Sequence, residues 1–298
     1  MAILELSHVQ KRFGDRAVLR DVSFSVPEHT LFGFVGQNGA GKTTTMKLIL
    51  GLLKRDGGEI AVNGEPVRYG QTATNRWIGY LPDVPEFYSF MTPAEYLRFC
   101  GEITGMPARE IKPRADELLS LVGLAKEKRR IRGFSRGMKQ RLGIAQALFS
   151  RPKLLICDEP TSALDPIGRK EILDILADAK RQTTVVFSTH ILSDVERICD
   201  EIAFLHNGAI ALQGPLEAVK QRRGDAGFEL ELERPQDAEL LRKAFPDTTP
   251  ISPSHLLFPR DDQAEAVMRL LVQEHIPVRR LEKREPTLES LFLEVTGQ

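Results

Sequence analysis

Nine consecutive residues, Gly36–Thr44, carry the clearest chemical pattern in the chain, and they read GQNGAGKTT. They fit the pattern G-x-x-x-x-G-K-[ST] of a P-loop, in which backbone N–H groups surround the phosphates of a nucleotide. Glycines suit such a loop because they have no Cβ to hinder the approach of an anion. In this pattern Lys42 reaches the β- and γ-phosphates, and the Thr43 hydroxyl binds Mg²⁺. The residues expected to contact the phosphates are Gly36, Asn38, Gly39, Ala40, Gly41, Lys42, Thr43 and Thr44.

Two adjacent carboxylates, Asp158 and Glu159, follow the apolar run Leu154–Cys157. An acid at the carboxyl end of a central parallel strand lies where Mg²⁺ needs a ligand. We expect Asp158 to bind the metal, directly or through water, and Glu159 to orient or deprotonate the attacking water. The alternative, in which both carboxylates only cap the next helix, leaves unpaired charge at a dry strand end, which is costly.

A single histidine, His190, comes just after the next apolar run, Thr183–Ser188. Because neighbouring parallel strands end at the same sheet edge, His190 is expected beside Asp158. A catalytic role and a structural hydrogen-bonding role are equally compatible with this position.

The elements that position these residues follow an α/β pattern. Leu31–Val35 predicts a buried strand that enters the phosphate loop, and Thr44–Leu50 predicts a helix whose N-terminus faces the anion. Further strands are predicted at Val22–Val26, Gly57–Gly64 and Trp77–Leu81, and a hairpin with an Asn-Gly turn at Ile202–Leu212.

A helical segment, about residues 88–150, interrupts this pattern. Thr92-Pro93-Ala-Glu95 combines a capping box with proline at the first helical position. A second helix is expected to stop at Gly123, and Ser135 is placed to cap a third that runs to about Phe149. The segment is therefore predicted to be an inserted α-helical subdomain.

The remaining residues predict a second, smaller domain. We place the first domain at residues 1–219, a polar linker at 220–227 and an accessory domain at 228–298. The expected element order of the accessory domain, βαββαβ, is typical of a small α+β ferredoxin-like fold. It carries no recognisable catalytic group.

The bulk composition excludes several classes. Lys+Arg and Asp+Glu number 41 each in 298 residues, so the zero net charge indicates neither nucleic acid nor an anionic membrane as the main partner. Three scattered cysteines fit a reducing compartment. The sequence shows no signal peptide and no apolar run of ~18 residues, so a soluble, cytoplasmic protein is expected.

Taken together, these motifs closely resemble the ATP-binding-cassette (ABC) ATPases over about residues 3–218. The family's signature corresponds to Phe134–Met138, its D-loop to Ser162–Asp165 and its switch histidine to His190. The resemblance implies that ATP and Mg²⁺ bind here, that Asp158 is the magnesium ligand and that Glu159 is the catalytic glutamate. The absence of an Asn-Lys-x-Asp motif likewise favours ATP over GTP.

The family also gives roles to residues outside these motifs. Phe13, which on its own reads as an edge-packing aromatic, falls where the family stacks adenine. Family ATP lies between the phosphate loop of one subunit and the signature of another. Ser135 and the Gly137 backbone would therefore contact the γ-phosphate in trans, which implies a dimer of this chain.

Two positions depart from the family pattern. Asp83 stands where the family usually has a metal-contacting glutamine, so we expect Asp83 to approach Mg²⁺, through water if necessary. Arg136 replaces a common glycine in the signature and adds positive charge near the triphosphate.

Within the family, the single cassette with a C-terminal domain resembles the separate ATPase subunits of bacterial exporters of the multidrug and daunorubicin-resistance type. By this resemblance, two copies sit beneath an integral-membrane permease on the inner face of the cell membrane. The aromatic segment Pro85–Met91 is a candidate docking surface, with core packing as an equal alternative. The competing functions are a soluble ABC ATPase that acts on nucleic acid or ribosomes, and a catalytically inactive regulatory module.

Overall fold

The structure is a computed structural model that describes residues 2–71, 73–221, 227–284 and 287–296. The chain divides into two compact units, Met1–Leu216 and Glu217–Gln298. The first unit has the α/β fold that the sequence predicts, and it contains every predicted site residue.

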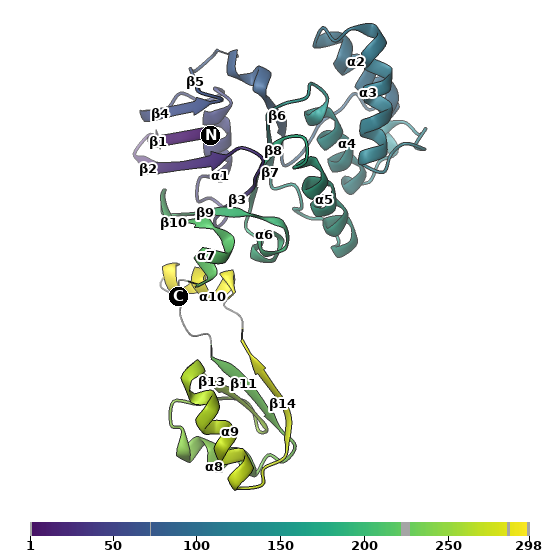
Figure 1. The fold of residues 1–298 in the computed structure, drawn as a ribbon. Coiled ribbons are helices and arrows are strands. Elements are labelled where there is room, and N and C mark those ends of the chain that lie inside the picture. The colour runs from purple at the N-terminus through teal and green to yellow at the C-terminus, as the bar shows by residue number, and fades with distance from the viewer. Residues whose placement is uncertain (1, 72, 222–226, 285–286, 297–298) are drawn as a thin grey trace. The chain divides into compact units, whose positions relative to one another are not determined.

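The first unit is built on one ten-stranded sheet, and Figure 1 labels its strands β1 to β10. In spatial order its strands are β5 (Glu65–Pro66), β4 (Gly57–Val62), β1 (Ala2–Phe13), β2 (Arg16–Pro27), β10 (Ala209–Pro215), β9 (Glu201–His206), β3 (Leu31–Val35), β8 (Thr184–Thr189), β7 (Leu154–Asp158) and β6 (Ile78–Leu81). From β6 to β9 the neighbouring strands are parallel, whereas β1 pairs with β2 and β4 in antiparallel fashion. The sheet thus joins a parallel α/β core to an antiparallel region.

The central strands are apolar because helices shield them from water. All residues of β3, β7 and β8 are buried. Helices α1 (Lys42–Ile49), α5 (Pro166–Ala179) and α6 (Leu192–Ile198) pack against these strands. Strands covered on both faces read as continuous apolar runs, which is why the sequence predicted them well.

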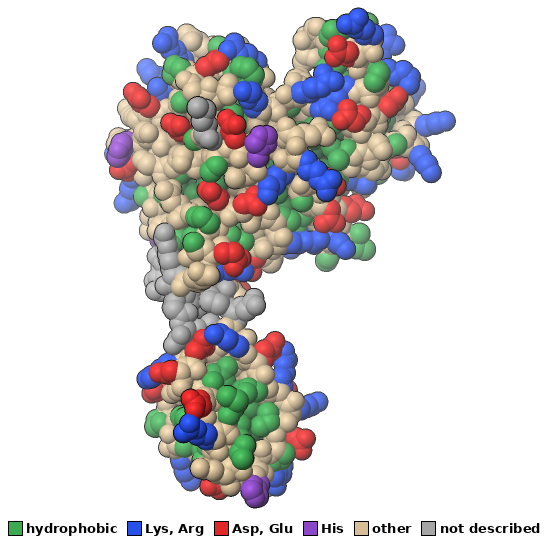
Figure 2. All heavy atoms as spheres, viewed as in Figure 1, with side chains coloured by type: hydrophobic (Ala, Val, Ile, Leu, Met, Phe, Trp, Pro, Cys, Tyr) green, Lys and Arg blue, Asp and Glu red, His purple; other side chains and the backbone are tan. Residues whose placement is uncertain are grey.

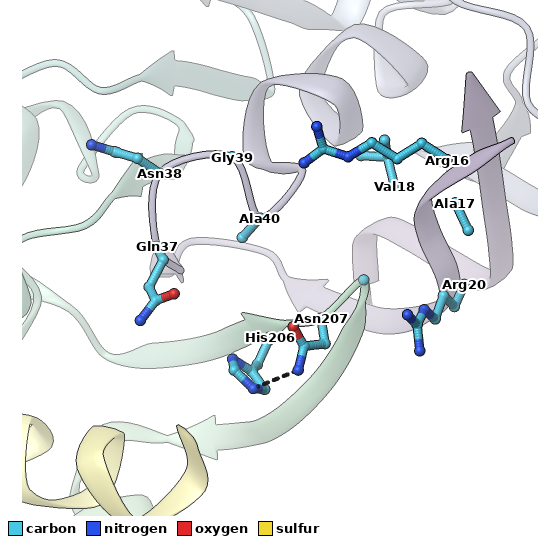
Figure 3. A pocket seen from close by; sticks show the side chains of 11 residues that line it. Arg16, Ala17, Val18, Arg20, Gln37, Asn38, Gly39, Ala40, His206 and Asn207 are labelled. Atoms are coloured by element: carbon cyan, nitrogen blue, oxygen red, sulfur yellow. Dashed lines mark hydrogen bonds between the residues drawn. The ribbon is translucent and has the colours of Figure 1, made fainter. Parts of the chain in front are cut away.

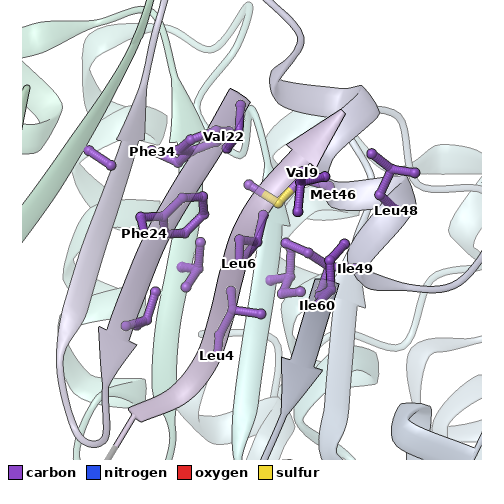
Figure 4. Close-up of a cluster of buried hydrophobic side chains, with 14 of the residues drawn as sticks. Leu4, Leu6, Val9, Val22, Phe24, Phe34, Met46, Leu48, Ile49 and Ile60 are labelled. Atoms are coloured by element: carbon purple, nitrogen blue, oxygen red, sulfur yellow. The ribbon is translucent and has the colours of Figure 1, made fainter. Parts of the chain in front are cut away.

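The antiparallel region packs its inner face on α1, and Figure 4 shows side chains of β1, β2 and β4 meeting that helix. The sequence predicted only the middle of β2 and missed β1. The pairing of β1 with β2 shifts register on either side of Val9, and His8 has a positive φ of 52°. Such bulges break the strict alternation by which a half-buried strand is recognised.

Three helices form the predicted subdomain: α2 (Pro93–Ile103), α3 (Ala108–Leu121) and α4 (Arg136–Leu148). The capping box of Thr92 and Glu95 is present, and Ser135 Oγ accepts a hydrogen bond from the Met138 N–H at 3.2 Å. Helix α4 lies close on β6, since a Cβ built at Gly79 would fall 2.1 Å from the Ala147 carbonyl oxygen. Glycine is therefore required where the subdomain meets the sheet.

The second unit contains a four-stranded antiparallel sheet in the order β12 (Thr249–Ser252), β13 (His255–Phe258), β11 (Phe228–Leu232) and β14 (Val278–Lys283). Helices α8 (Asp237–Ala244) and α9 (Ala264–Gln273) share its core, and α10 (Leu288–Thr296) follows. This is the predicted ferredoxin-like order. Helix α7 (Leu216–Gln221) was not predicted, and most of the predicted linker, residues 222–226, lies outside the described residues.

Candidate nucleotide-binding and hydrolysis site

The phosphate loop joins the end of β3 to the start of α1, as the sequence predicts. Gly41 caps the helix at a φ of +113°, a conformation that side chains rarely adopt. A Cβ at Gly36 would lie 2.7 Å from the Leu205 carbonyl oxygen, so this glycine lets the loop pass close to β9. The helix begins at Lys42, two residues earlier than predicted, because the loop closes directly into its first turn.

Some backbone N–H groups of the loop donate hydrogen bonds within the protein, and others can bind an anion. The N–H groups of Gly36 and Ala40 donate to the carbonyls of Thr189 and Gln37. The first N–H groups of α1 have no acceptor within the helix, which makes this end a binding site for an anion. Among the residues predicted to contact phosphate, Gly36 and Ala40 thus already use their N–H groups in hydrogen bonds within the protein. The contacts of the other predicted residues stay predictions.

Lys42 lies inside this loop, with 5% of its side chain exposed. Its ammonium donates to the carbonyl oxygens of Gly36 at 2.6 Å and Gln37 at 3.2 Å. The same nitrogen lies 3.0 Å from Glu159 Oε1. The Lys42 ammonium, to which the motif gives the role of binding phosphate, thus contacts two loop carbonyls and the Glu159 carboxylate in this structure.

A cavity of about 380 Å³ opens beside the loop. It is lined by Arg16, Val18, Asn38, Gly39, Gly41, Lys42, Thr43, Thr44, Asp83 and Glu159. A second hollow of about 240 Å³ lies around the same loop, and Figure 3 shows the Arg16 side chain extending from β2 toward it. Lys42, Thr43 and Glu159, which are predicted to bind phosphate, bind Mg²⁺ and activate water, therefore line the same cavity.

Asp158 and Glu159 point to different environments, as expected of neighbours at a strand end. Asp158 is buried, and its Oδ1 accepts a hydrogen bond of 2.6 Å from Ser188 Oγ on β8. The same Ser188 hydroxyl accepts the Glu159 N–H at 3.0 Å. Ser188 thus fixes the backbone and the carboxylate of the acidic pair together.

Glu159 is held in place by its backbone and by two side chains. Its φ of 48° is unusual for a residue with a side chain, and such conformations concentrate at functional sites. Its Oε2 lies 2.9 Å from His190 Nδ1, while Oε1 meets Lys42. The predicted meeting of His190 with the acidic strand end is therefore present.

Asp83 reaches the edge of the same cavity from the loop after β6. Burial raises the pKa of its carboxyl group; the Arg136 guanidinium opposes this shift, and the carboxylates of Asp158 and Glu159 add to it. Arg136 Nη2 lies 3.3 Å from Asp83 Oδ1. The two departures from the family pattern thus contact each other.

Four of the predicted residues that do not line this cavity, Gly36, Ala40, Asp158 and His190, belong to the phosphate loop or lie next to Glu159. The other three are Phe13, Ser135 and Gly137. Ser135 and Gly137 occupy the exposed first turn of α4, beyond the lining of their own chain's cavity. Phe13 ends β1 before the turn at residues 14–15, with 49% of its side chain exposed and the Lys11 ammonium 5.1 Å from its ring. The roles expected of these three residues stay predictions.

Sequence reasoning missed Ser188, Arg16 and Val18. Ser188 faces Asp158 directly in the register of β7 and β8, so a pairing of the two predicted strands could have found it. Arg16 pairs with Phe13 across the β1–β2 turn, a relation that required β1 to be predicted.

The donor set fits Mg²⁺ bound together with a nucleotide. Among the described residues, no cluster of three or more His, Cys, Asp or Glu side chains could hold a metal alone. Mg²⁺ is commonly bound by one or two protein oxygens with substrate phosphates and water. Thr43 and Asp158 supply that number beside a loop shaped for an anion.

Comparisons with known proteins agree with this chemistry. A family model described as ABC transporter matches residues 19–162. The chain is 37% identical to YxlF of Bacillus subtilis, an uncharacterized ABC transporter ATP-binding protein, over 98% of this chain and 99% of the relative. It is 34% identical to the bacitracin transport ATP-binding protein of Bacillus licheniformis, over 99% and 97% of the two chains. It is 33% identical to a Nod factor export ATP-binding protein of a Rhizobium species, again over 99% and 97%.

A solved structure described as the ATP-binding subunit of an ABC transporter has the same fold. It shares 33% identity with this chain at a TM-score of 0.66, over 74% of this chain and 93% of the other. In the described part of this chain, the helices are too short or too polar to cross a membrane.

Proposed function

Because the chain belongs to the family of ATP-binding subunits of ABC transporters, we propose that it is the ATPase of an exporter and drives a separately encoded membrane permease. The observation that carries the catalytic part of this proposal is the row of contacts from Lys42 through Glu159 to His190. These contacts support a role for Lys42 in phosphate binding, for Glu159 as the base and for His190 in orienting Glu159.

The roles of the residues follow from these contacts. Lys42 exchanges Glu159 for the β- and γ-phosphates and neutralises their charge. Glu159 then accepts a proton from the attacking water, and His190 holds the second oxygen of that carboxylate in place. Thr43 and Asp158 would hold Mg²⁺, and the ion would supply further stabilisation of the developing charge.

A second copy of the chain is the first proposed partner. Ser135 and Gly137 form the N-terminal turn of α4, whose exposed N–H groups suit an anion, yet they do not line the cavity of their own chain. A partner's triphosphate would complete this turn, and the partner's turn would complete this cavity. This supports a nucleotide-sandwich dimer.

A permease is the second proposed partner. In the predicted docking segment Phe87 packs edge-on against Tyr96 of α2, with ring centroids 5.1 Å apart. Tyr88 and Phe90 are instead 51% and 60% exposed, beside Val84 at 63%. Both alternatives thus apply to different residues of the segment, and the exposed ones form a small apolar surface close to Asp83 in sequence. Docking here would place the ATPase at the inner face of the membrane.

One relative is named for Nod factor export, which supports export as the direction of transport. The face of the first unit drawn in Figure 2 gives no support to the alternative of a nucleic-acid-directed ATPase. In the view of Figure 2, basic and acidic side chains are interspersed over the first unit, whereas a nucleic-acid site needs a one-sided basic patch.

The test is co-purification from native membranes in mild detergent, with tagged Glu159→Gln protein and ATP to hold the dimer closed. We expect a polytopic membrane protein in stoichiometric amount. A matched bait that also carries Tyr88→Ser and Phe90→Ser should retain ATP and lose that protein. Recovery of soluble or nucleic-acid partners alone, with no membrane protein, would overturn the transporter proposal and leave the ATPase standing.

A further inference from the structure

The contact between Asp83 and Arg136 joins the nucleotide cavity to the signature turn of the same chain. Asp83 lines the cavity, whereas Arg136 is the first residue of α4, between Ser135 and Gly137. Their side chains are 47% and 43% exposed, and 3.3 Å separates Oδ1 from Nη2. A half-exposed ion pair of this kind changes an equilibrium by only about two- to five-fold, so it can form and open readily.

A second contact ties the same loop to the same helix. Gln140, fully buried one turn further along α4, donates its amide to the Asp83 carbonyl oxygen at 2.7 Å. The other side of that amide, Oε1, has no hydrogen-bond partner among the described residues. A buried acceptor left without a donor costs free energy, so this arrangement is not the best that the two elements can reach.

One carboxylate cannot serve Arg136 and a metal ion equally. Asp83 lines the same cavity as Thr43 and Glu159, where Mg²⁺ is expected. A guanidinium and a dication repel each other. An Asp83 carboxylate that turns to the metal must therefore weaken its hold on Arg136. The released side chain then sits on the turn whose N–H groups suit an anion, where a positive charge favours a triphosphate.

We propose that Asp83 and Arg136 form an interlock within one chain, in which the ion pair holds the signature turn at the edge of the nucleotide cavity. The interlock opens when Asp83 engages the metal-bound nucleotide, and Arg136 becomes available to the triphosphate held by a second copy. Binding of nucleotide in the cavity of one chain thus prepares the signature turn of that chain to contact the nucleotide held by the second copy. This inference rests on the proposed ATPase dimer and adds to it a positioning role for Arg136.

The interlock is testable through binding alone. The affinity for a fluorescent ADP analogue is measured with and without Mn²⁺, and the ratio of the two values gives the contribution of the metal. Because Arg136→Gln removes the competitor for Asp83, it should raise this ratio about two- to five-fold. Asp83→Asn should lower it, and Arg136→Gln in the Asp83→Asn background should then change it by less than about two-fold.

Two controls separate the interlock from general charge effects. Arg98→Gln removes a comparable pair, Arg98–Glu102 at 2.8 Å on α2, and should leave the ratio unchanged. Arg136→Lys keeps the charge, so its ratio of affinities with and without Mn²⁺ should stay near that of the wild type. This variant also serves as a test if Arg136→Gln is unstable. Equal effects of Arg136→Gln with and without the Asp83 carboxylate would overturn the interlock while the ATPase stands. Failure of the unaltered protein to bind the analogue would instead overturn the proposed function, and the interlock with it.

Discussion

The ion pair between Lys42 and Glu159 leads to a prediction in which one substitution has two opposite effects. Lys42 Nζ and Glu159 Oε1 lie 3.0 Å apart, with 5% and 13% of the two side chains exposed. ATP must take Lys42 from Glu159, so the acid that activates water also competes for the phosphate lysine. Glu159→Gln is therefore expected to slow hydrolysis and to tighten ATP binding.

The size of each effect follows from the geometry. At an effective dielectric constant of ~20, unit charges at this distance attract by about 5 kcal/mol. Desolvation of the two buried charges offsets most of that attraction. The net value is then about 1.5 kcal/mol, the lower end for a charged hydrogen bond, which corresponds to roughly tenfold tighter binding. Loss of a general base lowers the rate by about 10²–10⁴-fold.

The two effects are measured separately, with calorimetric ATP titration for binding and phosphate release for hydrolysis. The matched control is Glu110→Gln, which removes an exposed carboxylate that pairs with Arg151 at 3.3 Å outside the site. It should change neither quantity. ATP binding that is unchanged or weaker in Glu159→Gln would refute the competition between Glu159 and phosphate. A hydrolysis rate within tenfold of the wild type would refute the role of Glu159 as the base.

Three further changes have defined outcomes. Ser188→Ala removes the donor that holds Asp158 and should weaken Mg²⁺ affinity, measured by titration of ATPase activity and of Mn²⁺ binding, by about tenfold. Gly79→Ala forces a Cβ onto an α4 carbonyl and should lower the free energy of unfolding in urea by about 1–3 kcal/mol, whereas Gly133→Ala, with open space around it, should change it by less than about 0.5 kcal/mol. Burial raises the pKa of Asp194, so its ionisation costs stability as the pH rises above the ordinary pKa of 3.8. Asp194→Asn should therefore raise the thermal midpoint at pH 8 and lose that gain below pH 3.8, whereas a constant gain at both pH values would contradict this cause.

The sequence predicted the parallel half of the fold and the chemistry at its edge for one physical reason. Strands buried on both faces and a phosphate loop are local patterns in the sequence. The loop ends at Lys42, Glu159 follows β7, and His190 follows β8. Lys42, Glu159 and His190 meet within hydrogen-bond distances because three neighbouring strands end at one edge. The resemblance to ABC ATPases, drawn from the same local motifs, is confirmed by relatives that cover nearly the whole chain.

What the sequence could not predict depends on pairing between distant segments. Strand β1 was missed because its bulges hide the alternation, and with it went the contribution of Arg16 to the cavity. The Ser188 hydroxyl is informative only once β7 and β8 are set in register. The roles given to Phe13, Ser135 and Gly137 stay predictions, since each depends on a nucleotide or a second copy.

These contacts describe a site whose charges are balanced before any ligand arrives. Lys42 is neutralised by Glu159, Glu159 is shared with His190, and Asp83 is paired with Arg136. Binding is then an exchange of partners, so its affinity is a difference between two sets of contacts of similar strength. For the pair of Lys42 and Glu159, it follows that removing either member should change nucleotide affinity in opposite directions: loss of the cation weakens it, and loss of the carboxylate tightens it.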